Sequence, residues 1–129
     1  MNKLYFLALI FVLINGCANN AQNDSQKVKL VGVKSAPFVP ASGPVERVYF
    51  TSVDNRERKT IWSSYPDKLD IWPGEHAVVV VCEWRPTATA PPMSKGLRRI
   101  EDTFEAGTIY EFTSKLERAG ECSISYKVK

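Results

Sequence analysis

The residues of this 129-residue chain best suited to covalent chemistry are its three cysteines, Cys17, Cys82 and Cys122. An unbroken apolar run, residues 4–14, ends three positions before Cys17. This run is too short to cross a bilayer as a helix, which takes about 20 residues, but it has the length of the apolar part of an export signal. Export would place Cys82 and Cys122 in an oxidising compartment as an even pair. A disulfide between them is expected, with two buried free thiols as the alternative.

The segment at residues 13–17 (LINGC) resembles the lipobox of bacterial lipoproteins, in which aliphatic residues and a glycine precede the cysteine that receives the lipid. Asn15 departs from this pattern, because a small or β-branched residue is usual there. The resemblance implies that residues 1–16 are a lipoprotein signal peptide and that Cys17 carries acyl chains, such as palmitate, that hold the protein on a membrane. Ala18, where an aspartate would favour the inner membrane, implies an outer-membrane location in the bacterial envelope. An ordinary signal peptide or an uncleaved anchor is the alternative.

Residues 18–27 are rich in amides and have no large apolar side chain, so they cannot support a core. Residues 17–27 are therefore expected to form a flexible, lipid-anchored tether. Residues 28–129 are enough for one domain. The net charge of +3 comes from 17 basic and 14 acidic residues. They are spread along the chain without a block of like charge, so no nucleic-acid partner is expected.

Apolar residues of the domain alternate over short runs separated by glycine, proline, asparagine and aspartate, and no long stretch has the period of a helix. This pattern predicts an all-β fold, a small antiparallel β-sandwich of about seven strands with one disulfide. Residues 77–82 (AVVVVC) are apolar on both faces and are expected in the middle of a sheet. Asp54-Asn55 and Pro73-Gly74 are expected to form turns. The expected strands are residues 28–34, 46–53, 57–62, 76–84, 97–104, 108–115 and 121–128.

Residues 69–80 (LDIWPGEHAVVV) resemble the PEGA type of β-sandwich repeat, in which a strand leads through Pro-Gly into a second strand that begins near a histidine. Residues 106–110 (AGTIY), followed later by Cys122, are similar to the second half of many short bacterial lipoproteins. The resemblance implies a sandwich fold and a noncatalytic role in binding or spacing at the envelope. The pair Cys82 and Cys122 departs from the PEGA pattern.

His76 is the only histidine of the chain, and no cysteine cluster with metal-ligand spacing accompanies it. Neither a metal site nor a cofactor is therefore expected. No catalytic residue is expected either, since no nucleophile-elbow sequence occurs, and Glu101 and Asp102 are neighbours whose side chains would point to opposite faces of a strand. His76 is better explained as a residue beside a turn.

Two groups of residues could act in binding. Basic residues near one turn and in a later strand could hold phosphate-bearing envelope polymers, although such charges more often form a solvated strand edge or face. They are Arg56, Arg58 and Lys59 near the turn and Arg98 and Arg99 in the strand. Aromatic rings could stack on sugars, although in a small sandwich they usually belong to the core. These rings are Trp62, Tyr65, Trp72 and Trp84.

Residues 85–96 (RPTATAPPMSKG) form the longest stretch of the domain without a strand pattern. Their prolines lack backbone donors and hold the chain extended, so the segment is expected to project from the sheet as a partner loop or a passive crossover. Its candidate contact residues are Arg85, Pro91, Pro92, Met93 and Lys95.

The sequence as a whole predicts a lipid-anchored envelope lipoprotein that acts as a noncatalytic binding or structural accessory module and docks an envelope protein. The alternative is an enzyme or enzyme inhibitor acting on envelope polymers such as peptidoglycan.

Lipid attachment at Cys17 can be tested by metabolic labelling with a fatty-acid analogue. We expect label on the wild-type protein and none on Cys17→Ser, because the thiol is the acceptor of the lipid. Equal labelling of the two proteins would refute the assignment.

Overall fold

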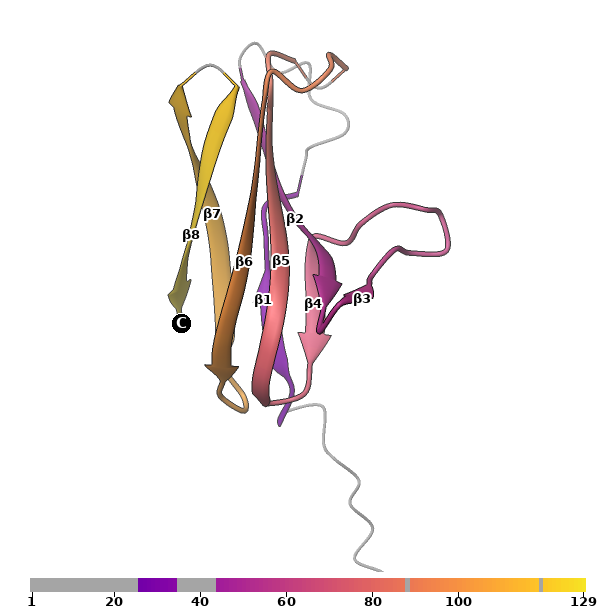
Figure 1. Ribbon diagram of the computed structural model, residues 1–129, viewed down its shortest axis with the longest axis vertical. Coiled ribbons are helices and arrows are strands. Elements are labelled where there is room, and N and C mark those ends of the chain that lie inside the picture. The colour runs from indigo at the N-terminus through magenta and orange to yellow at the C-terminus, as the bar shows by residue number, and fades with distance from the viewer. Residues whose placement is uncertain (1–25, 35–43, 88, 119) are drawn as a thin grey trace, which may run out of the picture.

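The computed structural model describes residues 26–34, 44–87, 89–118 and 120–129. The predicted signal peptide, Cys17 and residues 18–25 of the predicted tether lie outside the described residues. Eight strands in two sheets make up the described part (Figure 1). None of its residues belongs to a helix long and apolar enough to cross a membrane. The predicted all-β fold with one disulfide is confirmed.

Each sheet has four strands, and neighbouring strands are antiparallel except for β1 and β7, which run parallel. The first sheet has the order β4-β1-β7-β8, formed by β1 (Val28–Val31), β4 (Lys68–Ile71), β7 (Ile109–Arg118) and β8 (Glu121–Val128). The second has the order β3-β2-β5-β6, formed by β2 (Val45–Val53), β3 (Arg56–Glu57), β5 (Gly74–Arg85) and β6 (Ser94–Phe104).

The core lies between the two sheets and takes alternate residues from every strand except β3, whose two residues are both exposed. Val78 and Val80 of β5 are fully buried there, and the ring of Phe50 from β2 meets Phe112 of β7 edge-on, with centroids 5.1 Å apart. The opposite face of β5 is also covered, because Val81 is buried as well. This two-sided burial explains the continuous apolar run and confirms that β5 lies inside its sheet, between β2 and β6.

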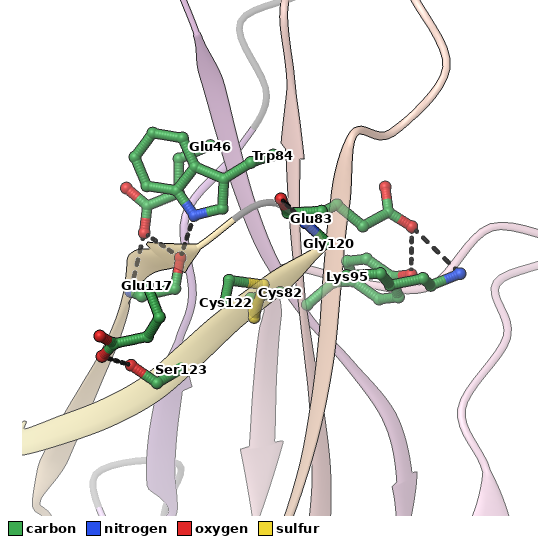
Figure 2. Close-up of a disulfide and its surroundings, with 12 residues drawn as sticks. Glu46, Cys82, Glu83, Trp84, Lys95, Glu117, Gly120, Cys122 and Ser123 are labelled. Carbon is green, nitrogen blue, oxygen red and sulfur yellow. Dashed lines mark hydrogen bonds and ion pairs between the residues drawn. A yellow bond between two sulfur atoms is a disulfide. The ribbon is translucent and has the colours of Figure 1, made fainter.

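The disulfide joins Cys82 of β5 to Cys122 of β8 and thereby links the two sheets (Figure 2). The sheet edges close beside it, where Ser94 of β6 bridges to Gly120. A Cβ atom added to Gly96 would lie 2.2 Å from the carbonyl oxygen of Cys122, so only glycine allows β6 to come this close to β8. The disulfide closes a loop of 40 residues, which stabilises the fold by about 4 kcal/mol on the chain-entropy model.

The predicted hairpin turn at Asp54-Asn55 is confirmed. Both residues have positive φ, 52° and 64°, which is the backbone of a two-residue type I′ turn. The turn joins β2 to β3, where Val53 pairs with Arg56. Pro73 lies between β4 and β5, but Gly74, with a positive φ of 125°, is already the first residue of β5.

Three local predictions are wrong. Residues 57–62 are not a strand, because β3 ends at Glu57 and the chain then leaves the sheet. The short strand β4 was not predicted, because its alternation consists of Leu69 and Ile71 alone, too little to stand out from a loop. The aromatic side chains do not all belong to the core, since Trp62 and Trp72 are exposed.

We expect Gly96→Ala to lower the free energy of unfolding by about 2 kcal/mol or more, because a methyl group there displaces β6 from β8. Urea unfolding measures the effect, with Ser125→Ala on the exposed face of β8 as the control. An unchanged midpoint for Gly96→Ala would contradict the close approach of these two strands.

Candidate docking surface

The connection between β5 and β6 is shorter than the sequence indicated. Strand β5 includes Arg85, and β6 already begins at Ser94, so the connection is residues 86–93, of which residue 88 lies outside the described part. We call residues 86–93 the docking loop. Residues 94–96 contain no proline, and their free backbone N–H groups let them pair with β5, where Lys95 lies opposite Glu83. Of the five predicted contact residues, Arg85 and Lys95 are therefore strand residues.

The docking loop is tied to the end of β5 by two hydrogen bonds. The backbone N–H of Met93 donates to the carbonyl oxygen of Trp84 at 2.8 Å, and the guanidinium of Arg85 donates to the carbonyl oxygen of Ala90 at 3.1 Å. Pro91, Pro92 and Met93 are exposed. The loop thus presents an apolar, proline-containing segment in a held conformation.

A buried carboxylate supports this arrangement from the outer face of the second sheet. Glu83 is only 5% exposed and accepts a hydrogen bond of 2.6 Å from the hydroxyl of Tyr49 and one of 3.2 Å from Arg85. The ammonium of Lys95 is 3.5 Å away, and Figure 2 shows this ion pair. Arg85 therefore connects the buried carboxylate to the docking loop.

The protonation behaviour of this cluster follows from burial and its hydrogen bonds. Burial by itself raises the pKa of Glu83, but the hydrogen bonds from Tyr49 and Arg85 and the charges of Lys95 and Arg85 outweigh it, so the pKa is lowered. Burial, and then the hydrogen bond to Glu83, raise the pKa of Tyr49. Glu83 is thus held as a carboxylate and Tyr49 as a neutral donor.

A second polar link lies at the same end of the sandwich, across the two sheets. The indole N–H of Trp84 donates to the hydroxyl of Ser114 at 3.1 Å, and that hydroxyl donates to Glu46 at 2.8 Å (Figure 2). Sequence reasoning found neither Glu46 nor Ser114, because they are 68 residues apart and neither has a motif. Glu83 and its partner Tyr49 were missed too. For Glu83 there was a signal, because this carboxylate directly follows the apolar run at residues 77–82.

His76 lies at the opposite end of β5 and connects two turns. Its Nδ1 is 2.5 Å from a carboxylate oxygen of Asp54, and its Nε2 is 2.7 Å from the carbonyl oxygen of Trp72. Each ring nitrogen thus faces an oxygen of a different connection. The backbone N–H of Ala77, and then His76, lower the pKa of Asp54. His76 was expected only as a residue beside a turn; here it also links the Asp54-Asn55 turn to the connection that contains Trp72.

The tryptophans proposed for sugar stacking are not assembled into a single site. Trp72 and Trp84 flank opposite ends of β5, and Trp62 lies in the connection between β3 and β4, so these rings do not form a common platform. Arg58 and Lys59 lie in that same connection. Across the described ranges, no three His, Cys, Asp or Glu side chains are grouped so that they could hold a metal ion.

A scan against protein-family models found no match, and comparisons with curated proteins and with solved structures found none either.

The contribution of Glu83 to stability should depend on pH. Because folding lowers its pKa, the carboxylate stabilises the fold above the unfolded-state value of about 4.3, and this stabilisation is lost as the pH falls through the folded-state value. We expect Glu83→Gln to reduce the free energy of unfolding by about 1 to 3 kcal/mol at neutral pH and by less in acid.

Urea unfolding at neutral and acidic pH measures this difference. Glu101→Gln is the control, because its ion pair with Arg99 is exposed and contributes little. If the free energies of unfolding of wild type and Glu83→Gln differed by the same amount at both pH values, the stabilising role of the Glu83 carboxylate would be contradicted.

Proposed function

We propose that this chain is a lipid-anchored envelope lipoprotein that acts as a noncatalytic binding or structural accessory module and docks an envelope protein through the docking loop. The lipobox-like residues 13–17 support the anchor, and Ala18 supports an outer-membrane location. The resemblance of residues 69–80 to PEGA repeats supports a noncatalytic role. No nucleic acid or cofactor has a part in this proposal.

The single observation that carries the docking role is the position of the loop in the fold. Val28 pairs with Ile71, so the chain enters the sandwich at the end where β4 leads into β5. Strand β5 then runs its 12 residues to the opposite end, a distance of about 40 Å at 3.3 Å per residue. The docking loop lies at that far end (Figure 1). With lipid on Cys17, the protein would present this loop away from the point of attachment.

The conformation of the docking loop also suits recognition. Its base is closed by the hydrogen bonds of Arg85 and Met93, and its prolines restrict φ. Binding therefore restricts few additional rotatable bonds of the loop, which lowers the entropic cost of association. Met93, 40% exposed, offers a flexible apolar side chain that adapts to the surface of a partner.

Recovery of a partner from gently solubilised envelopes tests the docking role. We expect the triple variant Pro91→Ser, Pro92→Ser and Met93→Ser to recover at least about tenfold less partner, equivalent to 1.4 kcal/mol. Its unfolding midpoint should stay near that of wild type, since all three side chains are exposed.

Val128→Ser is the matched control, because Val128 is an exposed apolar residue at the end of β8. Equal recovery by the triple variant and wild type would contradict docking through the loop. Recovery of peptidoglycan instead of a protein would favour an enzyme or inhibitor acting on envelope polymers. Loss of acyl label on Cys17→Ser tests the anchor separately.

A further inference from the structure

The connection between β3 and β4 projects from the side of the sandwich (Figure 1). Its most exposed large side chains are Ile61, 91% exposed, and Trp62, 84% exposed, and we call this pair the apolar tip. They are the two most exposed large hydrophobic residues of the described part of the chain. A single exposed apolar residue needs no explanation, but two neighbours on a projecting segment form a surface suited to binding.

The apolar tip belongs to a hydrogen-bonded turn. The backbone N–H of Thr60 donates to the carbonyl oxygen of Ser64 at 2.7 Å, and that of Ser63 donates to the carbonyl oxygen of Thr60 at 3.0 Å. The hydroxyls of Thr60 and Ser64 are also hydrogen-bonded, at 2.8 Å. Ser63 takes a positive φ of 57°, which is uncommon for a residue other than glycine. The turn thus satisfies several of its own polar groups, as a segment that leaves water must.

The base of the connection is packed against the second sheet. The ring of Tyr65 stacks on Tyr49 with centroids 5.8 Å apart, and Arg47 donates a hydrogen bond of 2.9 Å to the carbonyl oxygen of Tyr65. The backbone N–H of Arg58 donates to the carbonyl oxygen of Thr51 on β2. Both sides of the turn are therefore attached to the sandwich, and the apolar tip is held outward.

The chain that leads to the apolar tip is rich in cations. Arg56, Arg58 and Lys59 precede it, with Glu57 as the one carboxylate of the same stretch. Glu57 pairs with Lys59 at 3.4 Å. An excess of cations therefore remains beside two exposed apolar side chains. This combination matches the boundary of a membrane, where tryptophan lies at the headgroup level and cations bind phosphate.

We infer that the apolar tip inserts into the headgroup region of a membrane that contains anionic phospholipid, with Arg56, Arg58 and Lys59 on the lipid phosphates. The inference rests on the proposed envelope location and adds a second membrane contact to the lipid on Cys17. A membrane can accept protruding side chains without a preformed pocket, so the convex shape of the tip suits a lipid surface. The lipid anchor raises its effective concentration at the membrane, so a weak contact suffices. The connection that carries the tip projects from the side of the sandwich, whereas the docking loop lies at one end (Figure 1). Contact of the tip with a membrane would therefore leave the docking loop accessible.

The experiment uses the full lipidated chain in vesicles of phosphatidylcholine, with and without phosphatidylglycerol. Brominated lipids quench tryptophan fluorescence only on contact, and the part due to Trp62 is the difference between wild type and Trp62→Phe. We expect the fluorescence of Trp62 to be quenched by brominated lipid in the vesicles that contain phosphatidylglycerol. In those vesicles Trp62 should also be shielded from quenching by aqueous iodide. The double variant Arg56→Gln and Arg58→Gln should lose at least half of the quenching, because the attraction to anionic lipid weakens.

A photo-cross-linker in cells distinguishes lipid from protein as the occupant. Placed at Ile61, benzoylphenylalanine should form adducts with phospholipid, whereas placed at Leu97, an exposed apolar position on β6, it should form none. Protein adducts at Ile61, or Trp62 quenched equally by iodide with and without vesicles, would overturn the inference. If the wild-type protein carried no acyl label, the lipid anchor on Cys17 would be refuted. The quenching of Trp62 by vesicles would still test the apolar tip, because it does not depend on that label.

Discussion

The bond between Cys82 and Cys122 crosses the core at the end of the sandwich that carries the docking loop. Backbone hydrogen bonds hold the strands within each sheet, but between the sheets the contacts are chiefly those of side chains. The disulfide therefore sets the distance between β5 and β8. That distance brings Gly96 against the backbone of Cys122. The position of the docking loop depends on this closed edge, since its second end begins β6.

Polar groups at the same end of the sandwich orient β5 and the docking loop. Burying the carboxylate of Glu83 would be unfavourable without partners, and Tyr49, Arg85 and Lys95 supply them. Arg85 also binds the carbonyl oxygen of Ala90, so the buried charge and the loop share one guanidinium. On the other side of the strand, Trp84 reaches Ser114 in the opposite sheet. The docking loop is thus braced from both faces of β5.

The molecule has two surfaces with different physical character. The docking loop lies at the far end of β5, contains prolines and is linked through Arg85 to the buried carboxylate of Glu83. The apolar tip lies on the side of the sandwich, is closed by its own hydrogen bonds and is accompanied by cations. A lipid at Cys17 would hold the sandwich at the membrane, where contact of the apolar tip limits its orientations. The docking loop, at the opposite end from the anchor, would remain accessible to a protein partner. The two proposed roles are therefore compatible within one small domain.

Local features of the sequence determined most of the fold. Alternation of apolar residues acts over a few positions, so it identified β1, β2 and the strands from β5 onward. The dipeptide Asp54-Asn55 identified the turn after β2, and the even pair Cys82 and Cys122 identified the disulfide. Only the tertiary structure decided which residues meet across long separations, such as Glu83 with Tyr49, and which apolar residues stay outside. Ile61 and Trp62 have the composition of a strand, yet they are exposed because the chain leaves the sheet after Glu57. Burial depends on the packing of the whole sandwich, and that packing is not encoded in any short segment.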